Sequence, residues 1–252
     1  MTFNEIVKFG YLFTRLCGDK VPYGIVVDGN TVPYNYDKRL IELLELENGW
    51  IAAVALVICA VVAYFIGSLN FAVILSRIFH HDDIRKHGSG NAGATNMTRT
   101  YGKKWGIITF ICDGLKAVVS VVGAMLLMGE GGAYIAALFA VLGHIFPVYY
   151  KFQGGKGVAV ASLSILCLNP LVFGILLLIF VITVATSRYI SLGSLICAFL
   201  YPLLLDAFNS SNGFISTVVS ILLAIIVIFM HRENIKRLRN RTENKIGEKA
   251  KK

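Results

Sequence analysis

Long apolar runs separated by short polar stretches dominate the sequence from Trp50 onward. Five of these runs are long enough to form a membrane-spanning helix each: residues 50–76, 105–128, 132–150, 190–207 and 214–230. Residues 157–186 form another run, which Asn169-Pro170 divides into two short spans because a helix tends to end before a proline. The pattern predicts an all-α integral membrane protein with about seven transmembrane helices.

The first 49 residues are more polar and hold no such run. The stretch VVDGNTVPY predicts a β-hairpin with Asp28-Gly29-Asn30 at its turn, and residues 38–47 (KRLIELLELE) predict one short amphipathic helix. This is too little chain to bury a core of its own. We therefore expect three regions: a polar N-terminal extension of unknown role (1–49), a transmembrane domain (50–231) and a basic tail (232–252).

Composition agrees with a membrane protein. Hydrophobic residues make up 56% of the 252 residues, charged residues 15%, and the mean hydropathy is +0.68, whereas soluble domains carry about 25% charged residues. The five cysteines form no C-x-x-C pair, and four lie inside apolar runs. We interpret them as small buried hydrophobic residues and expect no disulfide framework, no metal site and no cofactor.

The distribution of charge predicts an orientation. Residues 50–252 carry nineteen Lys and Arg against eight Asp and Glu, and none of the basic residues falls in 129–132, 169–170 or 208–213. If these three segments are the outer loops, every basic loop and the basic tail lie inside, which places the C-terminus in the cytoplasm and the N-terminus outside. Nucleic acid is not expected as a partner, because no soluble basic domain could hold it; cytoplasmic loops and an anionic substrate account for the net charge of +9.

Three motif loops then share the cytoplasmic face: Asp83–Lys104 with GSGNAGATN, Gly143–Ala159 with GHIFPVYYKFQGGKGVA, and His231–Lys245. A shorter stretch, SRYISLGS, joins them. Glycine lets the backbone approach a ligand and point successive N–H groups at it, which suits phosphate. Residues 88–93 match the dinucleotide-binding pattern G-x-G-x-x-G, but no strand precedes them, so a dinucleotide fold is not favoured. The second loop departs from the phosphate-loop pattern G-x-x-x-x-G-K-[ST], because Tyr150 replaces its first glycine and Gly157 its Ser or Thr. The alternative is that these glycines only make tight loops.

Several ionisable residues stand at or inside the apolar runs. Asp113 and Lys116 are three residues apart on one helix face, so they can pair and lower the cost of their burial. His144 and His231 lie near inner helix ends, where a histidine is more often a structural hydrogen-bonding group than a base. His231 and Asn234 share a face that points back toward the glycine loops.

Taken together, these stretches resemble the motifs of the bacterial acyl-phosphate:glycerol-3-phosphate acyltransferases, the PlsY family. DIRKHGSGNAGATNMTR is similar to the first motif, GHIFPVYYKFQGGKGVA to the second, and HRENIKRL followed by TENKIG to the third. SRYISLGS and the Asp113–Lys116 pair also fit. The likeness covers about residues 50–247.

The resemblance implies a seven-helix fold with the N-terminus outside, in a bacterial cell membrane. It implies transfer of an acyl group from acyl phosphate to the 1-hydroxyl of glycerol 3-phosphate, giving lysophosphatidic acid and phosphate. Membrane lipids would surround the enzyme, and a soluble enzyme that supplies acyl phosphate would be a further partner. The implied catalytic residues are Ser89, Arg99, His231 and Asn234; the implied substrate-binding residues are Asn91, Gly93, Thr95, Asn96, His144, Gly154, Gly155, Lys156, Gly157 and Arg188.

Three positions depart from the family pattern. Arg241 stands where a glycine usually precedes the Thr-Glu of the third motif, Val160 replaces a common threonine, and Ala117 a common glycine. His231 and a substrate phosphate both remain open as acceptors of the hydroxyl proton. The main alternative function is a transporter or channel for an organic anion, which intramembrane Asp113 and Lys116 would suit. A membrane anchor for the N-terminal extension is a third, weaker interpretation.

Overall fold

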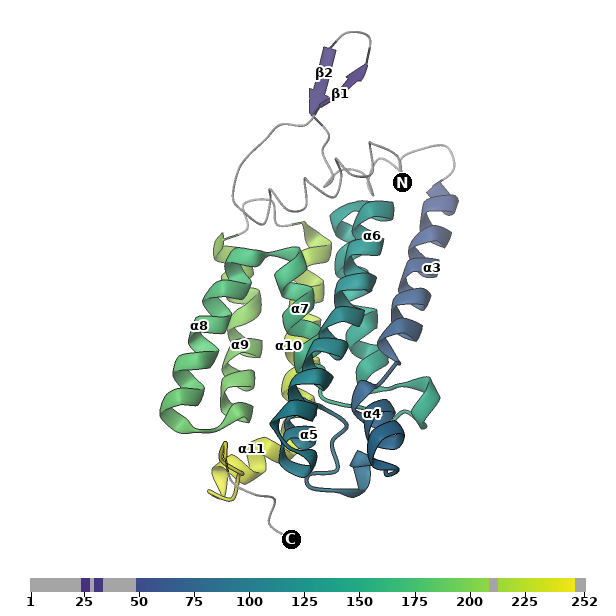
Figure 1. Cartoon of the computed structure of the whole chain (residues 1–252). Helices are drawn as coiled ribbons and strands as arrows, with labels where there is room; N and C mark the ends of the chain where they lie inside the picture. The colour runs from purple at the N-terminus through teal and green to yellow at the C-terminus, as the bar shows by residue number, and fades with distance from the viewer. Residues whose placement is uncertain (1–23, 28–29, 34–48, 209–212, 248–252) are drawn as a thin grey trace.

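Helices packed side by side make up most of the structure, a computed structural model that describes residues 24–27, 30–33, 49–208 and 213–247 (Figure 1). In chain order the elements are β1 (Gly24–Val27), β2 (Asn30–Pro33), α3 (Gly49–Gly67), α4 (Phe71–His80), η1 (Ile84–Lys86), α5 (Ala94–Tyr101), α6 (Lys103–Ile145), η2 (Val148–Tyr150), α7 (Val158–Leu168), α8 (Pro170–Ser187), α9 (Ile190–Phe208), α10 (Phe214–Met230) and α11 (Arg232–Arg239). Apart from one hairpin, the described chain is therefore helical.

The predicted hairpin is present. Strands β1 and β2 pair antiparallel, with Gly24 opposite Pro33 and Val27 opposite Asn30. Residues 28–29 of the predicted turn and the predicted helix at 38–47 lie outside the described residues.

The apolar helices confirm an all-α membrane protein. Four described segments are long and apolar enough to cross a membrane: Ala53–His80, Lys103–Tyr150, Pro170–Ser187 and Ile190–Phe208. A fifth is added if α10 and α11, which are bent by 56° relative to each other, count as one span. Helix α7 has 11 residues, fewer than the roughly 20 that cross a bilayer, so the number of seven spans stays a prediction.

The first apolar run is broken into α3 and α4 rather than continuing as one helix to residue 76. Asn70 begins α4, because its side chain accepts a hydrogen bond from the Val73 amide at 3.1 Å. Gly67 ends α3 in close contact with Ala140, whose carbonyl oxygen would lie 2.3 Å from a Cβ at this position. The break therefore sits deep in the helix bundle, where α3 meets α6.

Helix α6 folds back on itself at Gly129, which adopts φ 73° and ψ −164°. Lys116 and His144 are 28 residues apart, yet Lys116 Nζ lies 3.0 Å from His144 Nδ1. A straight helix would separate these residues by about 42 Å. The predicted outer loop 129–132 is wrong in extent, since residues 130–132 are helical and glycine's freedom at positive φ makes the turn at one residue.

The predicted division at Asn169-Pro170 is confirmed. Helix α7 ends at Leu168, α8 begins at Pro170, and the Asn169 side chain accepts from the Val172 amide at 3.1 Å. Proline at the first helical position loses no hydrogen bond, because that N–H has no partner within the helix anyway. Short α7 therefore ends where α8 begins, at the end of the bundle opposite the motif stretches (Figure 1).

Candidate active site

The motif stretches meet at one end of the helix bundle, where α4, α5 and α11 also lie (Figure 1). Arg85 of the first stretch donates from Nη1 to the Tyr150 carbonyl of the second at 2.9 Å. Lys156 of the second donates from Nζ to Oδ1 of Asn234 in the third. The expectation that these stretches lie together is confirmed; which side of a membrane they face stays a prediction.

A polar pocket with about 1100 Å³ of empty space, including its open mouth, lies among these stretches. Eleven of the fourteen predicted site residues line it: Ser89, Asn91, Gly93, Thr95, Asn96, Arg99, His144, Lys156, Gly157, His231 and Asn234. The three others, Gly154, Gly155 and Arg188, lie outside this lining. The sequence motifs thus converge on one concave surface.

Asn96 holds the first loop in place. Its Nδ2 donates to the carbonyls of Ile84 at 3.2 Å and His87 at 2.9 Å, while its Oδ1 accepts from the Ser89 amide at 3.0 Å. Asn96 is 1% exposed, whereas Ser89 is exposed at the pocket. Gly88 fits this arrangement because a Cβ there would lie 2.2 Å from Asn96 Oδ1. Asn96 therefore shapes the loop that presents Ser89.

Two helices begin at the pocket. Gly93 precedes α5 and Gly157 precedes α7, and neither helix start receives a hydrogen bond from a capping side chain. Ala94 and Val158, the first residues of these helices, both line the pocket. Helix N-termini present unpaired N–H groups and a partial positive charge, which bind phosphate and carboxylate. The pocket consequently offers two positions for anionic groups.

Gly154 and Gly155 serve packing within the protein. Their amides donate to the carbonyls of Ile145 and His144, each at 3.1 Å. A Cβ on Gly155 would lie 2.1 Å from His144 Nε2 and 2.8 Å from the carbonyl oxygen of Ala92 in the first loop. These two N–H groups are therefore engaged, and the amides that open onto the pocket belong to the start of α7 instead.

Glu243 organises the third stretch. Its carboxylate accepts from Ser191 Oγ at 2.9 Å, from Asn234 Nδ2 at 2.7 Å and from Arg237 Nε at 2.7 Å. Burial raises the pKa of this carboxyl, but the hydrogen bonds from Arg237, Asn234 and Ser191 outweigh burial and hold the pKa below its usual value. Because Asn234 donates to Glu243, its oxygen is turned toward Lys156.

Lys156 and His231, which also line the pocket, have lowered pKa values. Burial, helped by Arg237, lowers the pKa of Lys156 to about 8. Burial also lowers the pKa of His231, the residue after α10, to about 4. His231 Nδ1 lies 2.7 Å from the Val227 carbonyl and must donate to it, so Nε2 of the neutral ring is the nitrogen that can accept a proton.

A buried pair, Asp113 and Lys116, lies at the pocket, which Asp113 lines. Lys116 Nζ is 3.1 Å from Asp113 Oδ1, and the side chains are 2% and 1% exposed, so the predicted pairing is confirmed. Lys116 also donates to the carbonyls of Gly67 at 2.7 Å and Leu69 at 2.6 Å, where α3 ends. Its other neighbour is His144, which lines the pocket. The cation thus neutralises the carbonyl end of a broken helix.

The chain after α11 folds back against the corner between α8 and α9. Arg188 and Ile246 exchange two hydrogen bonds, Ile246 N to Arg188 O at 2.8 Å and Arg188 Nη2 to Ile246 O at 3.1 Å. Arg188 is therefore placed to hold the tail. Arg241, at the family's usual glycine, adopts φ 56°, in the left-handed region that glycine tolerates best. Val160 and Ala117, the other departures, are fully buried in the core.

Among the other residues that line the pocket, Phe110, Phe180, Ser191 and Arg237 had no role assigned from the sequence. Arg237 had a detectable signal, since it follows Asn234 by three positions on the same helical face. Phe110 and Phe180 had none, because an aromatic residue in an apolar run looks like any lipid-facing or core residue.

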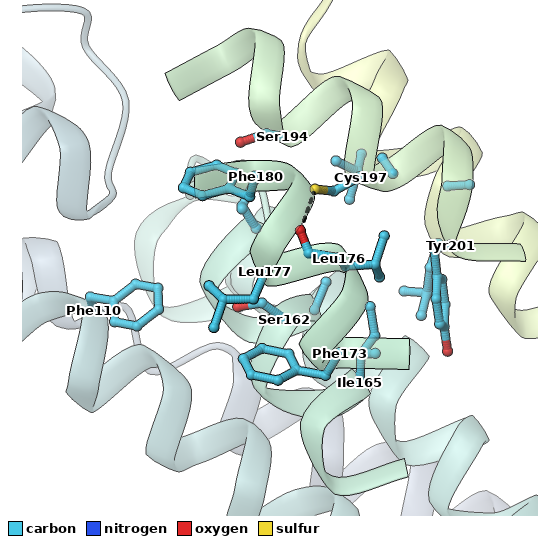
Figure 2. A pocket seen from close by; sticks show the side chains of 16 residues that line it. Phe110, Ser162, Ile165, Phe173, Leu176, Leu177, Phe180, Ser194, Cys197 and Tyr201 are labelled. Carbon is cyan, nitrogen blue, oxygen red and sulfur yellow. Dashed lines mark hydrogen bonds between the residues drawn. The ribbon is translucent and has the colours of Figure 1, made fainter. Parts of the chain in front are cut away.

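An apolar pocket with about 820 Å³ of empty space adjoins the polar one (Figure 2). It lies between α7, α8, α9 and α10, with Phe110 of α6 at its side. Phe110, Val158, Phe180 and Ser194 line both pockets. A ligand with a charged head and an apolar chain can therefore occupy both at once.

Comparison with known proteins gives one consistent result. The family model described as glycerol-3-phosphate acyltransferase matches residues 57–241. Among curated relatives, the glycerol-3-phosphate acyltransferase of Thermoanaerobacter pseudethanolicus is 44% identical over 195 residues, covering 77% of this chain and 97% of that protein. The glycerol-3-phosphate acyltransferase of Syntrophomonas wolfei is 43% identical over 203 residues, covering 79% and 98%.

Solved structures agree. The crystal structure of PlsY (YgiH), an integral membrane glycerol 3-phosphate acyltransferase, in its glycerol 3-phosphate form superposes with a TM-score of 0.73 and 32% identity. The match covers 77% of this chain and 96% of that one. The lysophosphatidic acid form gives a TM-score of 0.70 and 31% identity, with the same coverage.

Proposed function

This chain belongs to the glycerol-3-phosphate acyltransferase family, as a multi-pass membrane protein of the PlsY type, and from that premise we propose its reaction in full. It transfers a fatty acyl group from acyl phosphate to the 1-hydroxyl of sn-glycerol 3-phosphate. The products are lysophosphatidic acid and inorganic phosphate. The PlsY structures are described as a glycerol 3-phosphate form and a lysophosphatidic acid form, which supports this acceptor and this product.

The observation that carries the proposal is the joining of the polar and apolar pockets through four shared residues. The acyl chain lies in the apolar pocket, where burial of its methylenes supplies binding free energy. The two phosphate groups lie in the polar pocket, near the starts of α5 and α7 and the cations of Arg99 and Lys156. The acyl carbonyl then lies at the boundary, close to both substrates.

The chemistry asks for positioning rather than for a covalent intermediate. The 1-hydroxyl oxygen attacks the acyl carbonyl carbon, a new ester C–O bond forms, and the bond from that carbon to the phosphate oxygen breaks. Phosphate leaves with the bonding electron pair. Arg99, Lys156 and the Ser89 hydroxyl stabilise the charge on the carbonyl and phosphate oxygens.

The hydroxyl proton has two acceptors in this arrangement. One is Nε2 of His231, which the hydrogen bond from Nδ1 to Val227 leaves as the basic nitrogen. The other is the phosphate of the acyl donor, which becomes more basic as it leaves. In the second case His231 orients the hydroxyl and need not take the proton.

We place this reaction at the cytoplasmic face of a bacterial cell membrane. The basic residues lie at the pocket end of the bundle, which the positive-inside rule assigns to the cytoplasm. Glycerol 3-phosphate is then available from the cytoplasm, a soluble enzyme supplies the acyl phosphate, and the lipid product passes into the bilayer. A transporter is less favoured, because Asp113 and Lys116 are engaged at the break between α3 and α4.

The decisive experiment gives the purified protein labelled glycerol 3-phosphate together with acyl phosphate, acyl-CoA or acyl-carrier protein in separate reactions. Labelled lysophosphatidic acid should form with acyl phosphate. Formation only with a thioester donor would reject the donor assignment, and no product with any donor would reject the enzymatic function.

Arg99→Ala should lower kcat/KM, because the activation free energy should rise by about 2–5 kcal/mol when one partner of a buried charge pair is removed. Exposed Lys104→Met, outside the pocket lining, is the matched control.

A further inference from the structure

The apolar pocket has a measurable depth. Each of three helices contributes one residue where the apolar pocket meets the polar one, and another residue seven positions away in the sequence. These pairs are Val158 and Ile165 on α7, Phe180 and Phe173 on α8, and Ser194 and Tyr201 on α9. Seven residues of helix rise by about 10 Å. Three independent helices therefore give the same depth, and Figure 2 shows Ser194 and Tyr201 well apart along α9.

The far end of this pocket is closed. Within about one turn beyond it, the same helices and α10 place side chains that belong to a single packed core: Leu168, Val172, Leu205 and Val219. These four are between 0% and 5% exposed. Because protein cores are packed to crystal-like density, an acyl chain cannot advance past this level without displacing them.

Tyr201 is the rigid part of the floor. It lines the pocket, is 2% exposed, and its hydroxyl has no hydrogen-bond partner among the described residues. Phe173 is only partly buried, and Phe110 and Leu177 at the side of the pocket are 43% and 47% exposed, so these side chains have room to move. A fully enclosed ring, by contrast, can yield only if the core around it rearranges.

We propose that Tyr201 determines the longest acyl chain that the enzyme uses efficiently. The inference rests on the proposed acyltransferase function and adds a specificity-determining residue to it. Each methylene that stays buried favours binding by about fourfold, so the donor's kcat/KM should rise with chain length until the terminal methyl reaches Tyr201. Beyond that length a further methylene is not buried in the pocket, and kcat/KM should stop rising or fall.

The test is a competition between two saturated acyl phosphates of different length in one reaction, with the two lysophosphatidic acids measured by mass spectrometry. The product ratio reports the ratio of kcat/KM values and does not depend on how much of the enzyme is folded. Tyr201→Ala opens space below the floor. It should raise the ratio of long to optimal chain by at least about tenfold, as two or more newly buried methylenes require.

Two controls separate the floor from general damage to the core. Tyr201→Phe keeps the ring and should leave the product ratio unchanged. Tyr134→Ala removes an equally buried tyrosine from the same core, but Tyr134 does not line the pocket, so its ratio should also match the unsubstituted enzyme.

A substitution that makes the pocket shorter, rather than longer, gives a second, independent measurement. Ala198 lines the pocket about halfway between Ser194 and Tyr201 and is partly exposed, so a larger side chain has room. Ala198→Leu should move the optimum to shorter chains. It also decides the matter if Tyr201→Ala does not fold.

Three results would overturn the inference: an unchanged product ratio in active Tyr201→Ala, an unchanged optimum in Ala198→Leu, or a flat chain-length profile of the unsubstituted enzyme. A flat profile would mean that long chains leave sideways past Phe110 and Leu177. Failure of the proposed function looks different, since the unsubstituted enzyme would then make no lysophosphatidic acid from any donor.

Discussion

Lys156 links charge and geometry at the scale of single residues. Its ammonium donates to Asn234, and burial lowers its pKa to about 8. A phosphate-binding role needs the charged form. As pH rises through about 8, Lys156 loses its proton, and the pocket loses a cation where we place anionic substrates.

This gives a pH prediction. The kcat/KM for acyl phosphate should fall as pH rises through about 8, because only protonated Lys156 attracts phosphate. Lys156→Arg keeps a charge at every accessible pH, so its kcat/KM should be lower overall but should not show this alkaline decline. The measurement is initial rate against pH for both proteins. An identical alkaline decline in Lys156→Arg would assign the titration to another group.

Arg241 shows a residue under backbone strain. It adopts φ 56°, is exposed, and stands directly before the Thr-Glu that closes the third motif. For a residue with a Cβ, the left-handed backbone conformation costs about 1–2 kcal/mol of folding free energy. Glycine avoids this cost, but its larger conformational entropy in the unfolded chain offsets part of the gain. The turn is nevertheless formed, because Glu243 two residues later is held by three hydrogen bonds.

Replacement of Arg241 by glycine should therefore stabilise the protein by roughly 0.5–1 kcal/mol. Lys236→Gly provides the matched comparison, since Lys236 is an exposed basic residue inside α11 and glycine there should destabilise the protein by about 0.5–1 kcal/mol. Thermal unfolding in detergent would show the two midpoints moving in opposite directions. Two equal decreases would mean that Arg241 contributes contacts that outweigh its strain.

Residue types could be read from the sequence, but their partners could not. The glycines at 154–155 suggested amides aimed at phosphate, yet those amides bind carbonyls of His144 and Ile145. Nothing local encodes that choice, because the carbonyls become available only where α6 ends. Asn96 is similar: its role in shaping the first loop depends on two carbonyls up to 12 residues away.

At the scale of elements, the break between α3 and α4 depends on a third helix. Lys116 of α6 donates to the carbonyls that end α3, and the Phe71 amide at the start of α4 lies 3.5 Å from Asp113 Oδ1. Opposite charges thus face the two helix ends whose partial charges they complement. The break positions Asn70, whose Nδ2 donates to Ala92 in the first loop at 3.2 Å.

Lys116→Met should destabilise the protein by about 3–5 kcal/mol, because it removes the cation that pairs with the Asp113 carboxylate in a buried site. Adding Asp113→Asn should recover part of that loss, since the remaining charge is then removed. Lys103→Met, at an exposed position of the same helix, should change stability by less than about 0.5 kcal/mol. Thermal midpoints of the four proteins check this. No recovery in the double variant would show that the lost contacts to α3 dominate.

Local signals predicted some element boundaries and missed others. Asn169 caps α8 and Pro170 is the first residue of that helix, so two adjacent residues were enough to predict the division between α7 and α8. The end of α3 at Gly67 was not predicted as a helix boundary, because the close contact with Ala140 and the ammonium of Lys116 both come from α6. The turn at Gly129 was predicted at the correct place but with too many residues, since Gly131 and Gly132 are equally suited to a loop.

At the scale of the whole molecule, the order of the helices places the basic segments at the pocket end of the bundle. Helix α9 leaves the pocket at Ser191 and runs to Phe208, and α10 returns from Phe214 to His231. Gly129, Asn169 and Gly213 consequently lie at the opposite end from the pocket, and no Lys or Arg lies in the segments 129–132, 169–170 or 208–213 that contain them. The charges of the loops predicted this separation of basic residues from the opposite end of the bundle. The joined pockets could not be predicted in this way, because their lining residues come from several segments far apart in the sequence.

The predicted orientation in the membrane can be tested by labelling. Gly213 and Lys236 are exposed at opposite ends of the α10–α11 segment, and neither lines the pocket. In a background without the five native cysteines, Gly213→Cys should react with a membrane-impermeant thiol reagent added to intact cells, because basic segments stay inside. Lys236→Cys should react only after the membrane is opened. Labelling of Lys236→Cys in intact cells would invert the arrangement and place the pocket, where we propose that the phosphate groups bind, outside the cell. Glycerol 3-phosphate made in the cytoplasm could not then reach it, and the proposed reaction would have to be abandoned with the orientation.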